Sequence, residues 1–125
     1  MNSRISKILP GTIKKNGGEF WLAVENGEVI GTIALVMLQN DCAVLKGFFV
    51  KSEYRSKKIG LKLYEALLAF AKARGVKHII LDTPSVAHAS HRFYERSGFR
   101  KITKDELLTE YTYPDRDSIL YMLDL

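Results

Sequence analysis

The chain has 125 residues, enough for one hydrophobic core and too few for two ordinary domains. With 46% hydrophobic and 26% charged residues it has the composition of a globular protein, and no apolar run approaches the roughly 20 residues that a membrane-spanning helix needs. The net charge of +5 indicates anionic partners, which at this level include nucleic acid, acidic lipid and nucleotide cofactors. We expect a single domain over residues 1–125.

The cysteine content and the start of the chain bear on localisation. Cys42 is the single cysteine, so no internal disulfide can form. The first residues, Met1–Ile5, lack the long hydrophobic segment of a secretory signal. Both features predict a protein of the reducing cytoplasm. Because no cationic group immediately flanks Cys42, we expect a small buried hydrophobe at a strand start rather than a reactive thiol.

The first half of the chain is predicted to form an antiparallel meander. Residues 1–19 carry no clear element, because pairs of Pro and Gly residues break any helix there. Phe20–Glu25 has the pattern of a strand, and the Asn-Gly pair that follows is typical of a hairpin turn. The returning strand, Val29–Leu38, contains Gly31, where we expect a bulge or a close approach. Cys42–Val50 is the third strand.

After residue 58 the hydrophobic residues recur at helical spacing. Gly75 marks the expected end of this helix, after basic residues in its last turn. The β-branched run Val76–Asp82 is predicted to be a buried strand. Strand, helix and strand in this order form a crossover unit, so the strands at 42–50 and 77–83 should run parallel. The apolar stripe of the helix comprises Ile59, Leu63, Leu67 and Phe70, widened by Tyr64, Leu68 and Ala71.

A second helix and two further strands complete the predicted fold. Ser85 is the expected N-cap of the helix, which ends near Ser97. The segments 98–103 and 118–124 have the pattern of strands, and the connection 104–117 between them is long enough to be a functional candidate. The fold class is therefore α/β: a mixed, mostly antiparallel sheet with a central parallel strand pair and two main helices.

The segment Lys46–Gly60 is the most informative part of the chain. An apolar strand breaks into a short basic loop with Arg55, Lys57 and Lys58, and a helix begins at Ile59. The first turn of a helix has unpaired N–H donors, and its dipole favours negative charge. This pattern predicts a polyphosphate site. Basic residues concentrated here suit a local pocket better than a nucleic-acid duplex, which needs a longer basic face.

Two segments together resemble one known family. Val50–Leu63 is similar to a strand, an Arg/Gln-x-x-Gly-x-Gly/Ala loop and a helix, and His91–Phe99 resembles a Tyr-Glu-Lys-x-Gly-Phe ending. In this order and on these elements they resemble the GNAT superfamily of acyl-CoA-dependent N-acetyltransferases. The resemblance covers roughly residues 20–125 and describes an N-terminally short member, because relatives carry a strand and two helices before the first hairpin.

The resemblance implies a site for acetyl-CoA, the co-substrate of that family, and no metal. The two parallel strands would splay apart, and the pantetheine arm would pair with the backbone of residues 48–50. N–H groups from Arg55 to Gly60 would bind the pyrophosphate. Tyr94 matches the tyrosine that many members place beside the sulfur as a general acid. The implied coenzyme-binding residues are Phe48, Phe49, Val50, Arg55, Ser56, Lys57, Lys58, Ile59, Gly60, Leu61 and Lys62.

Three positions depart from the family pattern. Lys58 replaces the first glycine of the motif, and Ser56 replaces a glycine that often follows the arginine. Glycine allows positive φ and a close approach of backbone to phosphate, so Lys58 either compensates with its charge or reshapes the loop. Ala87 stands where relatives commonly have an asparagine at the start of the second helix.

The sequence offers candidates for the oxyanion donor, the general acid and the general base, and it leaves alternatives open. A backbone N–H near Phe49 or Val50 would stabilise the oxyanion, and Tyr94, with an ordinary pKa of about 10, would protonate the leaving thiolate. Tyr94 is otherwise a packed ring on a helix. The general base is left open among Glu25, Glu28, Asp82 and a chain of water molecules.

Two further features have functional and structural interpretations. His88 and His91 have a spacing compatible with metal binding, but two histidines without a third ligand more often serve surface or cofactor-edge roles. The connection 104–117 is rich in acidic residues, which favours a cationic acceptor if it borders the site, and a solvated loop otherwise.

These observations predict a cytoplasmic acyltransferase that moves an acetyl group from acetyl-CoA to a primary amine of a small molecule or a protein, by direct attack. The alternative is a non-catalytic CoA-binding domain that regulates or scaffolds a partner, and a basic nucleic-acid-binding module ranks third. No membrane partner is expected. A homodimer would complete an acceptor pocket whose wall the short N-terminal segment does not provide.

Overall fold

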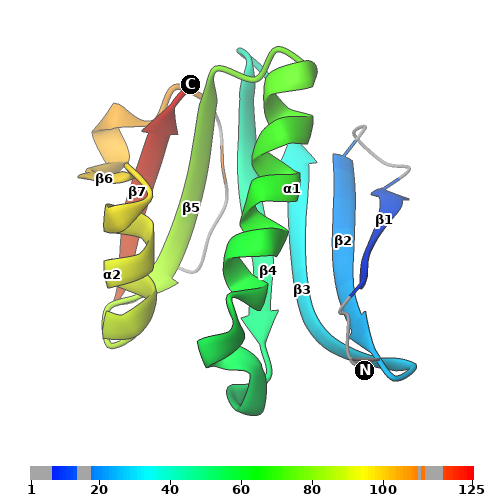
Figure 1. Cartoon of the computed structure of the whole chain (residues 1–125). Helices are drawn as coiled ribbons and strands as arrows, with labels where there is room; N and C mark the ends of the chain where they lie inside the picture. Colours follow the sequence, from blue (N-terminus) through cyan, green and yellow to red (C-terminus); the bar gives the residue numbers. More distant parts are fainter. Residues whose placement is uncertain (1–6, 14–17, 110, 112–116) are drawn as a thin grey trace.

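The computed structural model describes residues 7–13, 18–109, 111 and 117–125 (Figure 1). Within these residues, seven strands form one sheet in the order β1-β2-β3-β4-β5-β7-β6. Two α-helices and two 3₁₀ helices, η2 and η3, connect them. The elements are β1 (Lys7–Ile13), β2 (Gly18–Glu25), β3 (Glu28–Met37), β4 (Cys42–Val50), η2 (Ser52–Lys57), α1 (Ile59–Ala73), β5 (His78–Pro84), α2 (His88–Arg96), β6 (Arg100–Ile102), η3 (Lys104–Glu106) and β7 (Ser118–Asp124).

The sheet is antiparallel except for β4 and β5, as the sequence predicts. The parallel pairing joins only Cys42–Val44 of β4 to His78–Ile80 of β5. Beyond these residues the two strands diverge, and Figure 1 shows them separating toward their carboxyl ends, with α1 and α2 on the same face of the sheet. The predicted splayed pair and the predicted fold class are confirmed.

The main core lies between the sheet and the helices. The predicted stripe of α1 supplies Ile59, Leu63, Leu67 and Ala71, which are all buried, and Phe70 sets its ring edge against Trp21 with centroids 5.5 Å apart. Gly31 lies under this helix, because a Cβ there would be 3.0 Å from Leu63 Cδ1. The close approach predicted at Gly31 is therefore present, and it lets α1 pack directly on β3.

A second, smaller cluster covers the opposite face of the sheet. Because successive side chains of a strand point to opposite faces, Ile80, Leu120 and Met122 lie on the face away from the helices, together with Ile102 and Cys42. Cys42 is fully buried, and burial raises the pKa of its thiol. The thiol is therefore packed and protonated, as expected from the sequence.

The N-terminal segment differs from the prediction. Lys7–Ile13 forms the edge strand β1, which pairs antiparallel with β2. Pro10 lies opposite Trp21 in this pairing, and Gly11 leaves room for the ring of Phe20. Residues that break a helix are tolerated in an edge strand, because one side of such a strand has no ladder partner. Because these Pro and Gly residues argue only against a helix, the sequence left residues 1–19 without a clear element.

The start of α2 also differs from the prediction. Ser85 is not its N-cap: the helix begins at His88 after Ala87, and no side chain caps it. The strand β5 continues through Pro84, and the N–H of Ser85 donates to the carbonyl of Asp117 at 2.6 Å. Ser85 thus belongs to the sheet end rather than to the helix.

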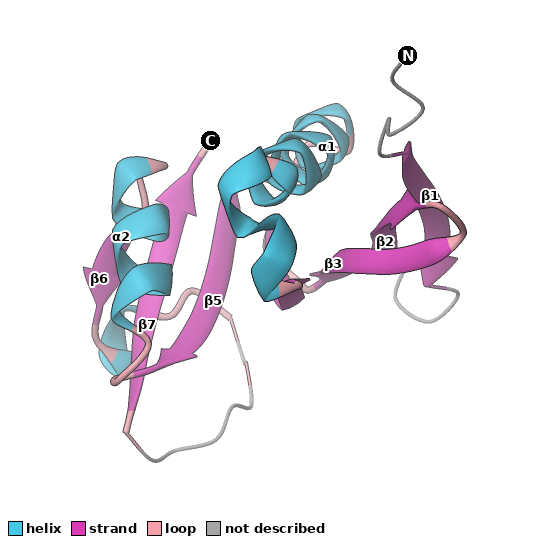
Figure 2. Cartoon of the chain, turned by 60° about the horizontal axis from the view of Figure 1, so that its bottom comes forward, coloured by secondary structure: helices cyan, strands magenta, loops and turns pink. Residues whose placement is uncertain are grey.

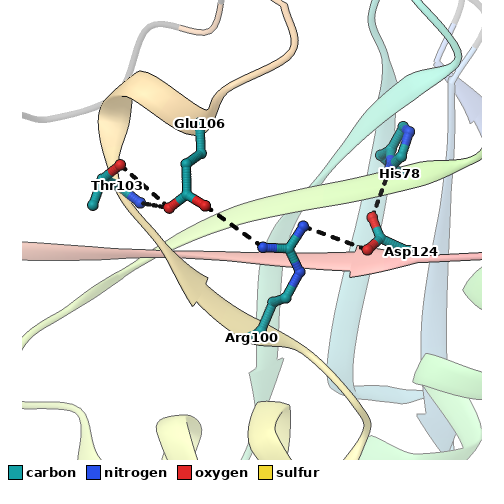
Figure 3. Close-up of polar contacts among 5 residues, drawn as sticks. All are labelled: His78, Arg100, Thr103, Glu106 and Asp124. Atoms are coloured by element: carbon teal, nitrogen blue, oxygen red, sulfur yellow. Dashed lines mark hydrogen bonds and ion pairs between the residues drawn. The ribbon is translucent and has the colours of Figure 1, made fainter.

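A chain of polar contacts ties the end of the sheet together (Figure 3). His78 on β5 contacts Asp124 on β7 with 2.8 Å between Nδ1 and Oδ1. Arg100 on β6 lies between Asp124 and Glu106, at 3.4 and 3.8 Å. Glu106 accepts the N–H of Thr103 at 2.7 Å, which closes a capping box around η3. These contacts hold three strands and the turn after β6 in register.

Candidate functional site

The carboxyl half of β4 is shaped by a bulge. Thr32 of β3 pairs with Phe49 and Ala34 with Lys46, so β4 carries one extra residue in this interval. Gly47 has a φ of 58°, and the hydroxyl of Thr32 donates to its carbonyl at 2.6 Å. The extra residue reverses the alternation of side chains, so Lys46 and Phe48 face opposite sides of the sheet. Phe48 turns toward α2, where its ring lies 5.3 Å from that of Phe93.

The basic loop after β4 is a turn of 3₁₀ helix followed by a left-handed residue. Lys58 has φ 61° and ψ 22°, and it ends η2 and precedes α1. The lysine therefore adopts a left-handed conformation that favours glycine, at a cost of about 1 to 2 kcal/mol. The first α1 hydrogen bond is donated by Lys62 to Lys58 at 3.1 Å, so the preceding N–H groups have no helical carbonyl to pair with. Arg55 folds back, and its Nε donates to the carbonyl of Val50 at 3.2 Å.

A cavity of about 640 Å³ lies between the end of β4, this loop and α2. Figure 2 looks onto the end of the sheet where β4 and β5 have separated, with α1 and α2 on either side. The structure brings together eight of the predicted residues here: Phe48, Phe49, Val50, Arg55, Lys58, Gly60, Leu61 and Tyr94. The sequence did not identify the α2 side of the wall, which comprises Ala89, Ser90, Phe93, Arg96 and Ser97.

Four predicted coenzyme residues remain, and of these Ile59 and Lys62 do not line the cavity. The side chain of Ile59 is 2% exposed and belongs to the core, so only its backbone N–H can face an anion. Lys62 is exposed on the first turn of α1. Ser56 and Lys57 belong to η2, where their backbone is described. The assignment of these four residues to a coenzyme remains a prediction.

Tyr94 lies deep between α2 and the sheet. Its side chain is 7% exposed, and its ring centroid is 6.4 Å from that of Phe48 and 5.9 Å from that of Tyr121. Burial, followed by the negative charge of Asp82, raises the pKa of Tyr94 to about 12. The phenol is therefore protonated throughout the neutral range and is a weaker acid than a free tyrosine.

A second cavity, of about 410 Å³, opens between β4 and β5 where the strands have parted. Phe48, Ser90 and Tyr94 line both cavities, so the two meet at Tyr94. The remaining wall of this second cavity comprises Leu45, Lys46, Gly47, Leu81, Asp82, Thr83, Pro84 and Ala87.

Of the three carboxylates considered as bases, Asp82 is the one that lines either cavity. Glu28 forms an ion pair with Lys51 at the start of β3. Glu25 is buried, and its hydrogen bond raises the pKa of the Tyr54 hydroxyl. Both glutamates are thus engaged at the β2–β3 hairpin. Asp82 instead accepts a hydrogen bond from the hydroxyl of Tyr111.

The two histidines of α2 contact other parts of the fold. His91 is buried, and its Nε2 lies 2.9 Å from the carbonyl of Pro84. The ring of His88 packs edge-on against that of His91, with centroids 5.7 Å apart. Over the residues that the structure describes, no group of three His, Cys, Asp or Glu side chains is placed to hold a metal ion.

Comparison with known proteins places the chain in a family. The sequence profile described as the acetyltransferase (GNAT) family matches residues 4–99. An N-acetylaspartate synthetase of Danio rerio is 34% identical over 103 residues, which are 82% of this chain and 36% of that protein. The chain belongs to the acetyltransferase (GNAT) family.

Solved structures agree with this assignment. An acetyltransferase from Streptococcus agalactiae 2603 superposes with a TM-score of 0.83 at 46% identity, covering 86% of this chain and 67% of that one. A GNAT family acetyltransferase from Elizabethkingia anophelis, solved with acetyl-CoA bound, shares the fold with a TM-score of 0.70 at 24% identity, covering 86% of this chain and 76% of that one.

The match to longer relatives is partial. The chain spans only 36% of the length of the Danio rerio protein and 38% of a probable N-acetyltransferase camello from Xenopus tropicalis, to which it is 34% identical over 66% of its own length. Neither described α-helix combines the length and apolar character needed to cross a bilayer.

Proposed function

We propose that this chain transfers the acetyl group of acetyl-CoA to a primary amine by direct attack. The observation that carries the proposal is the meeting of two cavities at Tyr94, one beside the basic loop and one between the parted strands. Direct transfer needs a donor and an acceptor that enter separately and touch at one point. The gap between β4 and β5 supplies such a point.

The residues of the first cavity fit the parts of acetyl-CoA. The pyrophosphate would accept hydrogen bonds from N–H groups at the start of α1, with Arg55 and Lys58 supplying positive charge. The pantetheine amides would pair with β4 in the manner of an added strand, since the parallel partner of β4 has turned away after Val44. The Elizabethkingia anophelis protein that shares this fold was solved with acetyl-CoA bound, which supports acetyl-CoA as the ligand.

The reaction requires movement of protons as well as the acetyl group. A bound ammonium loses one proton to become nucleophilic, and its nitrogen attacks the thioester carbon. The C–N bond forms and gives a tetrahedral oxyanion, and the C–S bond breaks as this intermediate collapses. The nitrogen loses a second proton to solvent, and the sulfur takes one up. Tyr94, which is protonated at neutral pH, would donate a proton to the sulfur. A backbone N–H of residues 48–50 would stabilise the oxyanion.

The experiment that tests the proposal measures release of free thiol from acetyl-CoA with a panel of primary amines. We expect amine-dependent thiol release and a product heavier by one acetyl group. A protein that binds acetyl-CoA and releases no thiol with any amine would instead be a non-catalytic CoA-binding domain.

A further inference from the structure

We propose that the second cavity is the acceptor site and that it selects amines that also carry a carboxylate, namely α-amino acids. Asp82 would bind the ammonium group and Lys46 the carboxylate. This inference rests on the proposed function, and it names the class of acceptor that the site favours.

The first argument is position. Asp82 follows Ile80 by two residues on β5, and Lys46 follows Cys42 by four residues on β4, before the bulge. Ile80 and Cys42 belong to the cluster on the face away from the helices, so Asp82 and Lys46 lie on that face too. The first cavity lies on the helix side. An acceptor would therefore approach the gap from the side opposite to the coenzyme.

The second argument is the state of the two charges. Asp82 accepts a hydrogen bond from Tyr111, and the ammonium of Lys46 lies 5.9 Å from the centre of the Tyr111 ring. Among the described residues, the four ion pairs leave out both Lys46 and Asp82. Tyr111 thus contacts both charged groups, which form no ion pair with each other. Within the described residues neither charge is held in an ion pair, so both can contact a ligand.

The third argument is complementarity. Lys46 and Asp82 are the cation and the anion among the described residues of this wall. An α-amino acid presents an ammonium and a carboxylate of opposite sign to these two groups. A polyamine would place a second cation near Lys46, and a lysine side chain of a protein would leave Lys46 without a partner. A cavity of about 410 Å³ is of the size that holds small ligands.

Of the acidic residues in the connection 104–117, Glu110 and Asp115 lie outside the residues that the structure describes. Asp105 and Glu106 lie in η3, and Glu106 is directed to Thr103 and Arg100 rather than to the cavity. Tyr111 brings the connection to the second cavity with an aromatic ring and a hydroxyl. The acidic residues of η3 therefore give no support to a purely cationic acceptor.

The test compares acceptors that differ only in the carboxylate. Thiol release is measured with the twenty common α-amino acids and with their decarboxylated amines, at saturating acetyl-CoA. We expect kcat/KM for the best amino acid to exceed that of its amine by tenfold to a hundredfold, the range of one charge-assisted contact. Equal values, or a preference for the amine, would overturn the inference.

Two variants separate the roles of the charges. Lys46→Met should bring the ratio of kcat/KM for amino acid over amine close to one, whereas Asp82→Asn should lower kcat/KM for both members of a pair alike. The matched control is Lys101→Met, an exposed lysine on β6, which should keep the ratio. Binding of acetyl-CoA, measured by calorimetry, verifies that each variant is folded.

The outcomes distinguish the inference from the function on which it rests. If amines are acetylated and Lys46→Met leaves the ratio unchanged, the acceptor assignment is wrong and the transferase remains. If acetyl-CoA binds and neither amino acids nor amines release thiol, the transferase proposal fails and the acceptor assignment fails with it.

Discussion

Two tyrosines of the aromatic cluster between α1 and α2 differ in what their hydroxyls can reach. Tyr94 lies where the two cavities meet. Tyr64 is buried beside Phe93 and Phe99, and its hydroxyl finds no hydrogen-bond partner among the described residues. Removing the hydroxyl from each residue therefore compares a candidate proton donor, Tyr94, with a packed ring, Tyr64.

We expect Tyr94→Phe to lower kcat by about a hundredfold or more, because the thiolate loses its proton donor. The dissociation constant of acetyl-CoA should change little, since the ring and its packing remain. Steady-state kinetics and calorimetry measure the two quantities. Tyr64→Phe serves as the matched control and should keep kcat. Equal kcat for wild type and Tyr94→Phe would remove this residue from the mechanism.

Alkaline stability should report on the same tyrosines. Burial is the first cause that raises the pKa of Tyr64, Tyr94 and Tyr121 to about 12, against 10 in the unfolded chain. A folded pKa above the unfolded value contributes stability that is complete below pH 10 and is lost as pH rises to about 12. Chemical denaturation between pH 8 and 11 should show this decline, and Tyr64→Phe should make it shallower.

At neutral pH, Tyr64→Phe should leave the free energy of unfolding unchanged or raise it by about 1 kcal/mol, because a buried unpaired hydroxyl is removed. A marked loss of stability would show that the hydroxyl has a partner.

The backbone of Lys58 gives a test at the loop. Lys58→Gly should raise the free energy of unfolding by about 1 kcal/mol relative to Lys58→Ala, because both remove the charge and only glycine relieves the positive φ. Both variants should bind acetyl-CoA more weakly than the wild type if the ammonium faces the pyrophosphate. Equal stability of the two variants would contradict the left-handed conformation.

At the scale of elements, periodicity and turn chemistry predicted much of the fold. The stripe from Ile59 to Ala71 identified α1, and the strand-helix-strand order identified the parallel pair. The strand β1 was missed because its Pro and Gly residues oppose a helix and are neutral toward an edge strand. The N-cap at Ser85 was wrong because pairing with β7 extends β5 through Pro84. In both cases pairing with a neighbouring strand, which local sequence does not reveal, determined the secondary structure of the segment.

The two cavities of the candidate site also differ in how far the sequence predicts them. The proposed coenzyme side includes one continuous segment, from Phe48 to Leu61, which a local motif marks. It also has a wall from α2, of which the sequence indicated only Tyr94. The acceptor side joins Lys46, Asp82 and Tyr111, which lie on β4, on β5 and in the connection before β7. No sequence spacing links these three residues. The sequence offered Asp82 as a candidate base and the connection as a functional candidate, by its length and its acidic residues, without naming Tyr111.

The contacts at the sheet end allow a prediction about acid stability. The hydrogen bond from His78, followed by the charge of Arg100, lowers the pKa of Asp124. A lowered folded pKa contributes stability above the unfolded value, near 3.8, and that stability is lost as pH falls through the folded pKa. Asp124→Asn should therefore cost less than about 1 kcal/mol at pH 7, because the pair is exposed. The difference from wild type should vanish near pH 2, as followed by urea denaturation.

At the scale of the whole molecule, the sheet separates two sides of the protein, and β4 and β5 diverge to leave a gap in it. The helices and the basic loop form one side, the cluster around Cys42 and Ile80 forms the other, and the strands part between them (Figure 1). Two features shape this gap: the short pairing of β4 with β5, and the bulge at Gly47. The fold thus separates the proposed coenzyme cavity from the proposed acceptor cavity, and the two meet at Tyr94.

The most direct test of this account is a calorimetric titration of the full chain with acetyl-CoA and, in parallel, with S-acetylpantetheine, which lacks the diphosphate and the nucleotide. We predict micromolar to sub-millimolar binding of acetyl-CoA and at least tenfold weaker binding of the truncated thioester, since the amides at the start of α1 hold the diphosphate. No binding of acetyl-CoA at millimolar concentration, or equal affinity for both ligands, would contradict the account.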